Sequence, residues 1–105
     1  MKSDILRAFS VSALPKIEIG EYGGAKLYAR RITGAELDQF RKAEKQQDAF
    51  LLCLSLCDER GERVFDDADV DRIGVVDIVT LKTWTDAVVK INHLDAKASE
   101  ETAGN

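Results

Sequence analysis

The sequence lacks several features that mark common classes of function. Its 105 residues include one proline, one histidine and two cysteines. No apolar run reaches the roughly eighteen residues that a membrane-spanning helix requires, and the N-terminus has no signal-peptide core. We therefore expect a cytoplasmic protein. A chain of this length is close to the common size of one domain, so a single domain is expected.

The scarcity of cysteine and histidine argues against a metal centre. Cys53 and Cys57 lie four residues apart inside an apolar run, a spacing that places both thiols on one face of a helix. A zinc site needs more ligands than this pair, and His93 is far away in the sequence. We expect two small buried residues in a reducing compartment, and His93 near the end of a helix as a surface residue or a favourable C-terminal cation.

Clustered positive charge is also missing. The formal net charge is −4, and proteins that bind nucleic acid usually carry concentrated Lys and Arg to neutralise phosphates. The basic residues at 41–45 alternate with acidic ones at three- and four-residue spacing, which is typical of a solvated helix face. The charge pattern therefore disfavours nucleic-acid binding.

Two short stretches of alternating polarity predict a β-hairpin near the N-terminus. They are KIEI (16–19) and AKLYARRI (25–32), and the loop GEYGG (20–24) joins them. A phosphate-binding loop would need Lys-Ser or Lys-Thr and a helix directly after the glycines, and this loop has neither. Upstream, MKSDILRAF fits either a short helical turn capped by Ser3 or a mobile arm.

Three helices are expected after the hairpin. The capping box TGAE (33–36) begins a long helix whose apolar positions continue at helical spacing to Cys57. Asp66 stands at the N-cap of a short helix, DADVDRI (67–73), and the last helix covers about 75–94. The predicted fold class is α+β and mostly helical, with a small N-terminal β-hairpin followed by three helices. We expect residues 1–94 to form the domain and residues 95–105 to form a flexible tail.

The acidic stretch CDERGERVFDDADV (57–70) does not match a reactive site. A calcium loop needs oxygen ligands at its first, third and fifth positions and glycine at its sixth. Counted from Asp58, the third position is Arg60 and Gly61 falls at the fourth; counted from Asp66, no glycine follows at the turn. Acid–base carboxylates need a pocket that separates their pKa values. We expect a turn and a helix cap, and no catalytic, cofactor-binding or metal-binding residue.

The last helix carries more apolar surface than a small core requires. Ile78, Leu81, Trp84, Val88 and Ile91 share one stripe, and the second half of the preceding long helix is apolar nearly all round. Either this surplus fills the core, or it serves self-association and the binding of a partner helix. The candidate partner-binding residues are Phe50, Leu51, Leu54, Leu81, Trp84, Val88 and Ile91. Homo-oligomers are also expected.

A small helix-turn-helix regulator centred on Gly74 is the alternative function. Its recognition helix would begin with Val75, Val76 and Asp77, which offer little to read base edges. The acidic composition also disfavours this alternative.

The segments LYARRITGAELDQF (27–40) and 51–94 resemble the tail assembly chaperones of long-tailed bacteriophages. The similar features are an apolar helix that ends in Asp-x-x-Gly, then VF with DxDV, then a helix that closes on Ile-Asn-x-Leu. The resemblance implies a morphogenesis factor of the host cytoplasm that is not an enzyme and has no cofactor. Such a factor coats the tape measure protein, keeps its apolar helices from aggregating, and helps to recruit tail tube protein.

Overall fold

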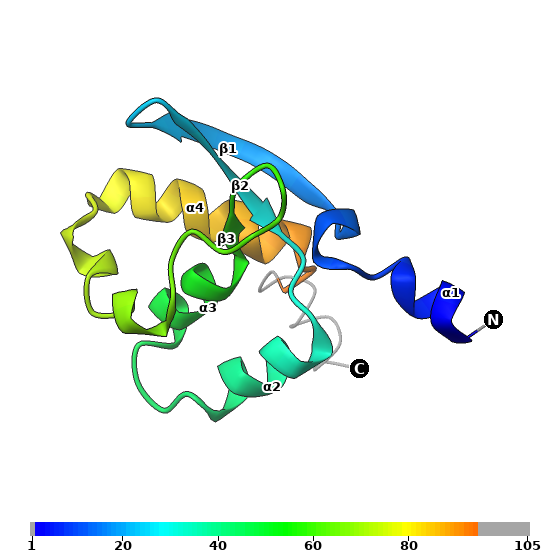
Figure 1. Cartoon of the computed structure of the whole chain (residues 1–105). Helices are drawn as coiled ribbons and strands as arrows, with labels where there is room; N and C mark the ends of the chain where they lie inside the picture. The colour runs from blue at the N-terminus through cyan, green and yellow to red at the C-terminus, as the bar shows by residue number, and fades with distance from the viewer. Residues whose placement is uncertain (1, 95–105) are drawn as a thin grey trace.

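The computed structural model describes residues 2–94, and Figure 1 shows the order of its elements along the chain. The elements are α1 (Lys2–Arg7), η1 (Val11–Ala13), β1 (Lys16–Tyr22), β2 (Ala25–Arg30), α2 (Gly34–Lys42), α3 (Gln47–Ser55), β3 (Leu56–Cys57), η2 (Asp67–Asp69), η3 (Ile73–Val75) and α4 (Ile78–Ile91), where η marks a 3-10 helix. The α+β class and the N-terminal hairpin followed by helices are confirmed. The expected flexible tail, 95–105, lies outside the described residues.

The hairpin pairs β1 with β2 in antiparallel register, from Lys16 opposite Arg30 to Tyr22 opposite Ala25, with a bulge between Glu18 and Gly20. Gly23 and Gly24 connect the strands with φ of 61° and 85°. A side chain at a positive φ is strained, so these two glycines allow the tight turn.

A third strand joins the sheet where the sequence predicts the end of a helix. β3 pairs antiparallel with β2, with Leu56 opposite Ala29 and Cys57 opposite Tyr28, and the strand order is β1-β2-β3. A continuous apolar run reads equally well as a strand or a buried helix, which is why periodicity alone missed β3.

The predicted long helix is wrong, because two helices occupy its place. α2 ends at Lys42, and α3 begins after Gln46, which adopts the left-handed conformation with φ of 54°. Residues 44–48 are all polar, so nothing in this stretch could hold a continuous helix against the core. The break lets α2 remain on the surface while α3 buries residues 51–55.

The helix ends depend on local caps. The capping box of Thr33 and Glu36 at the start of α2 is confirmed. Asp66 does cap the next segment, but the expected helix 67–73 is only the 3-10 turn η2, which is followed by η3. α1 begins at Lys2, so Ser3 lies inside that helix and is not its cap.

The last helix starts later than predicted. Asp77 is its N-cap: one carboxylate oxygen accepts from the Thr80 amide at 2.9 Å, and the other accepts from the Thr80 hydroxyl at 2.7 Å. These bonds, led by the one from the backbone, lower the pKa of Asp77. α4 ends at Ile91, ahead of the expected residue 94. The chain then passes through His93, an exposed residue with φ of 57°, as expected of a surface histidine.

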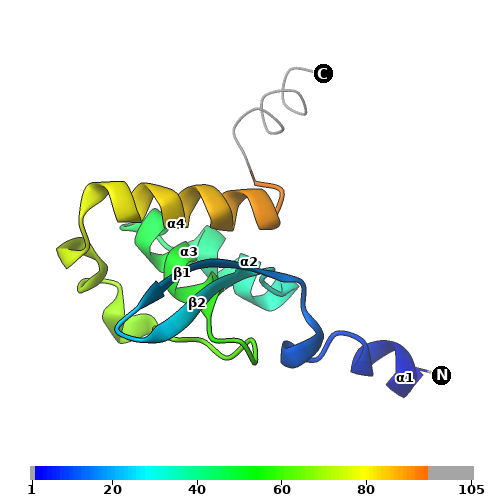
Figure 2. The same cartoon turned by 90° about the horizontal axis from the view of Figure 1, so that it is seen from above.

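The core lies between the hairpin, α3 and α4. α4 packs against α3 and against both strands of the hairpin, and Figure 2 shows it running along one side of these elements. The buried cluster consists of Leu27, Ala29, Leu51, Leu52, Cys53, Leu56, Ile73, Trp84 and Val88. None of the helices in residues 2–94 is both long enough and apolar enough to cross a membrane.

Candidate partner-binding site

Most of the seven candidate partner-binding residues lie inside the fold. Leu51, Leu54, Trp84 and Val88 are buried, whereas Phe50, Leu81 and Ile91 are half-buried. The four buried side chains cannot touch a partner unless the fold opens. Their role in partner binding stays a prediction.

Trp84 packs the inner face of α4 against two aromatic side chains. Its ring meets Tyr22 edge to face at a centroid distance of 5.5 Å and lies 6.1 Å from the ring of Phe65. Its indole nitrogen donates a hydrogen bond to the Tyr22 hydroxyl at 3.1 Å. Trp84 therefore ties α4 to the hairpin and to the loop before η2.

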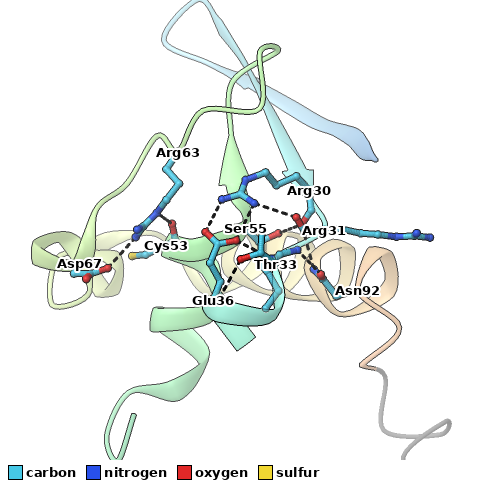
Figure 3. Close-up of polar contacts among 10 residues, drawn as sticks. Arg30, Arg31, Thr33, Glu36, Cys53, Ser55, Arg63, Asp67 and Asn92 are labelled. Atoms are coloured by element: carbon cyan, nitrogen blue, oxygen red, sulfur yellow. Dashed lines mark hydrogen bonds and ion pairs between the residues drawn. The ribbon is translucent and has the colours of Figure 1, made fainter. Parts of the chain in front are cut away.

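A buried arginine organises the polar interior (Figure 3). Only 3% of Arg30 is exposed, and its guanidinium donates two hydrogen bonds to Glu36, at 3.0 and 2.8 Å. Glu36 also accepts from the Thr33 amide. Burial alone would raise the pKa of Glu36, but the bonds from Arg30 and Thr33 outweigh it and hold this pKa below its ordinary value.

The backbone carbonyl of Arg30 joins two further elements to this network. The Ser55 hydroxyl at the end of α3 donates to it at 2.6 Å, and the Asn92 amide at the end of α4 donates to it at 3.2 Å. Asn92 also accepts from the Ile32 amide at 2.8 Å. These partners hold β2, α2, α3 and α4 together, which is a structural role.

The acidic stretch forms a turn and a cap, as expected. Asp58 accepts from the amides of Arg60 and Glu62, and Asp66 accepts from the amide of Ala68. Arg63 bridges the stretch to α3, because it donates to the Cys53 carbonyl at 2.8 Å and to Asp67 at 3.0 Å (Figure 3). Within residues 2–94, no three His, Cys, Asp or Glu side chains are grouped so that they could hold a metal ion.

The two cysteines are buried and free, as the sequence indicates. Burial raises the pKa of both thiols, that of Cys53 to about 11. A thiol that stays protonated is a poor nucleophile and a poor metal ligand. Cys53 and Cys57 therefore serve the packing of the core.

The accessible apolar surface lies at the start of α4. Val75, Ile78 and Val79 are 88%, 81% and 72% exposed. Beside them is a groove of about 510 Å³ between α3, η3 and the first turns of α4, which we call the α4 groove. Its lining residues are Gln46, Asp48, Ala49, Leu52, Val70, Asp71, Ile73, Gly74, Ile78, Leu81, Lys82, Thr85 and Asp86.

The α4 groove has an apolar floor and an acidic rim. Leu52 and Ile73 are buried beneath it, and Ile78 stands exposed at its edge. Three carboxylates, Asp48, Asp71 and Asp86, and one ammonium, Lys82, surround this floor. Apolar grooves with a charged rim are typical of surfaces that accept an amphipathic helix with basic flanks.

Sequence reasoning identified part of this site. Leu81 is among the seven candidates, and Ile78 belongs to the predicted stripe. Ile78, however, is exposed and not packed in the core. Val75 and Val79 flank the stripe, but no local pattern shows which flank the rest of the fold leaves uncovered.

These observations define a small α+β domain that, in its described part, presents an apolar groove and no reactive centre. The solved structure of the bacteriophage HK97 tail assembly chaperone has the same fold. The two match with a TM-score of 0.58 and 17% sequence identity, over 88% of this chain and 100% of that chain. No protein-family model matches the sequence, and no curated protein matches it significantly. The resemblance to tail assembly chaperones that the sequence motifs predicted is therefore confirmed at the level of the fold.

Proposed function

We propose that this protein is a bacteriophage tail assembly chaperone that binds the tape measure protein and helps to recruit tail tube protein. It would act in the host cytoplasm as a binding protein and not as an enzyme. The observation that supports this best is the likeness to the HK97 tail assembly chaperone, which extends over the whole of that chain. The α4 groove supplies a surface suited to the task.

An amphipathic client helix binds in the α4 groove through its apolar face. Such a helix presents side chains at three- and four-residue spacing, and a groove of about 510 Å³ accepts a few of them at a time. Ile78 is the main accessible anchor. Complete burial of an isoleucine contributes about 1.5–3 kcal/mol, so Ile78 could account for a large part of a weak interaction.

Weak binding at each groove suits a chaperone whose client is a long apolar helix. Several copies bound along one helix keep its surface from meeting other apolar surfaces, and each copy remains easy to displace when assembly proceeds. The half-buried Leu81 extends the floor, while Leu51, Leu54, Trp84 and Val88 are buried and do not line the groove.

The helix-turn-helix alternative finds less support. The surface around the start of α4 carries Asp71, Asp77 and Asp86, and these carboxylates would repel DNA phosphates. Arg72 and Lys82 lie at the same place, but with these three carboxylates among them the surface has no excess of positive charge to neutralise phosphates.

Co-expression with a tape measure protein from the same genome tests the proposal. We expect the chain to keep the tape measure protein soluble and to co-purify with it. Ile78→Asp should abolish both effects, whereas Val64→Asp should retain them, since Val64 is an exposed apolar residue outside the groove. If the tape measure protein is equally soluble with the wild type, with Ile78→Asp and with no chaperone, the proposed function is wrong.

A further inference from the structure

A second hollow, of about 560 Å³, lies between the N-terminal arm, residues 2–13, and the segment that joins β2 to α2. We call it the arm pocket, and its lining residues include Ala8, Phe9, Leu14, Pro15, Arg31 and Ile32. In Figures 1 and 2, α1 projects from one end of the molecule, and the turns that precede α4 lie at the opposite end. The arm pocket and the α4 groove share no lining residue, so both can be occupied at the same time.

The arm pocket belongs to a larger apolar surface. Ile5, Leu6 and Phe9 are 55%, 62% and 65% exposed, whereas Leu14 is buried. The helical path continues past α1, because the amides of Ala8 and Phe9 donate to the carbonyls of Ile5 and Leu6 at 3.2 and 3.1 Å. Ile5, Leu6 and Phe9 therefore lie on one side of the arm and continue the apolar wall of the pocket. Exposed apolar surface beside a hollow is typical of a binding site.

The charge around the arm pocket is mainly positive. Arg31 is the one charged side chain among its described lining residues, and the arm adds Lys2 and Arg7, with Asp4 as the carboxylate between them. Arg31 is held in place, because its Nε donates to the Ile91 carbonyl at 3.1 Å. Three cations and one carboxylate thus accompany this hollow, in a chain whose net charge is −4. The α4 groove has the reverse composition, three carboxylates and one ammonium.

We infer that the arm pocket binds an acidic, apolar segment of a second partner protein, different from the client helix of the α4 groove. The segment places large apolar side chains against Phe9 and carboxylates beside Arg31 and the arm. Opposite charges select the partner, so a segment with basic flanks is disfavoured here and accepted at the α4 groove. This second binding site goes beyond the proposed function and requires no client in the groove.

A protein segment fits the arm pocket better than a lipid surface does. A bilayer receives the protruding apolar face of an amphipathic helix. Here Phe9 lines a hollow whose other walls, Leu14, Pro15 and Ile32, come from the body of the fold. A volume of about 560 Å³ accepts a few inserted side chains, which a peptide supplies in a fixed order.

Fluorescence anisotropy with a labelled acidic peptide tests the inference on the full chain. The peptide is short, blocked at both ends, and carries leucine and phenylalanine at helical spacing among glutamates. It should bind with a Kd of about 100 μM or tighter, and added salt should weaken it. Phe9→Ser should weaken binding by about tenfold. Ile78→Ser in the α4 groove and Val64→Ser, an exposed apolar control, should bind as the wild type does.

Charge reversal tests the selectivity for carboxylates. Arg31→Glu should weaken the acidic peptide by about threefold to tenfold, and Arg7→Glu should act in the same direction without touching the bond from Arg31 to α4. Arg60→Glu makes the same charge change at an exposed position outside the pocket and should have little effect. Circular dichroism melting of each variant verifies that it remains folded, as expected for substitutions at exposed positions.

A second peptide, with lysines in place of the glutamates, separates the two sites. The basic peptide should lose affinity in Ile78→Ser and keep it in Phe9→Ser, which is the reverse of the behaviour of the acidic peptide. Failure of the basic peptide alone counts against the α4 groove, whereas failure of the acidic peptide alone counts against the arm pocket.

The inference is overturned if the acidic peptide does not bind, or if Phe9→Ser and both charge reversals bind it as the wild type does. Other occupants of the pocket would also overturn it, and each has its own signature. Combined Glu100→Gln and Glu101→Gln would tighten the peptide if the chain's own tail fills the pocket. Saturating peptide would dissociate an oligomer in sedimentation velocity if a second copy fills it. Vesicles of phosphatidylglycerol and phosphatidylcholine would displace the peptide if lipid does.

The client helix is the remaining rival for the arm pocket. Co-expression of Phe9→Ser with the tape measure protein should keep that client soluble, because the α4 groove is intact. Loss of solubility with Phe9→Ser would assign the pocket to the client and overturn the inference, while the proposed function would stand.

Discussion

Replacement of Trp84 should test the packing of the core most directly. From the sequence, Trp84→Ala is expected either to unfold the domain or to abolish association, depending on the face that Trp84 occupies. The structure places Trp84 on the inner face of α4, 4% exposed and in contact with Tyr22 and Phe65. The loss should therefore appear in the free energy of unfolding.

The magnitude follows from what the truncation removes. A buried tryptophan replaced by alanine costs about 3–5 kcal/mol, because apolar burial is lost and a cavity remains. Domains of this size have a free energy of unfolding of about 5–15 kcal/mol. Trp84→Ala should remove about a fifth of it or more. Trp84→Phe keeps an aromatic ring but loses the hydrogen bond to Tyr22, so it should cost only about 1–2 kcal/mol.

Urea unfolding followed by far-ultraviolet circular dichroism measures both variants. Tryptophan fluorescence is unsuitable, since the sequence has a single tryptophan. The matched control is Ile78→Ala, which truncates an exposed residue of the same helix and should change stability by less than about 1 kcal/mol. If Trp84→Ala unfolds at the same urea concentration as this control, the assignment of Trp84 to the core is refuted.

Three further predictions address the polar interior, the helix break and the thiols. Because the folded pKa of Glu36 is lowered, its stabilising contribution should be fully present above the ordinary value of 4.5 and lost as the pH falls through the folded pKa. Glu36→Gln should cost about 2–3 kcal/mol at neutral pH and flatten this pH dependence in urea unfolding, since it weakens the bonds to Arg30. Gln46→Gly should have a free energy of unfolding about 1–2 kcal/mol higher than that of Gln46→Val in urea unfolding, because glycine accepts a positive φ without strain. Cys53 and Cys57 should resist iodoacetamide in the native protein and react once urea unfolds it, as mass spectrometry would show.

The features predicted correctly from the sequence are those that a few adjacent residues determine. The turn at Gly23 and Gly24 needs only its own backbone freedom, and the cap at Thr33 needs only Glu36 three residues on. Asp66 likewise caps the turn that directly follows it. Local patterns of this kind keep their meaning whatever the remainder of the chain does.

The features that the sequence missed depend on distant partners. Leu56 and Cys57 continue an apolar run that suits a helix, and only pairing with β2 makes them a strand. The buried Arg30 has no local signature, because its guanidinium needs Glu36 and its carbonyl needs Ser55 and Asn92. An arginine beside a second arginine reads as surface charge until these partners are placed around it.

The apolar surplus inferred from the sequence divides into two parts with different roles. Along α4, Trp84 and Val88 complete the core, whereas Ile78 stays exposed at the edge of the groove. The two parts are separate because they lie on different faces of α4: Ile78, Lys82 and Thr85 line the groove, whereas Trp84 and Val88 are buried in the core. Folding and binding should therefore respond to different substitutions: changes at Ile78 should weaken association while the melting temperature holds, and changes at Trp84 should lower both together.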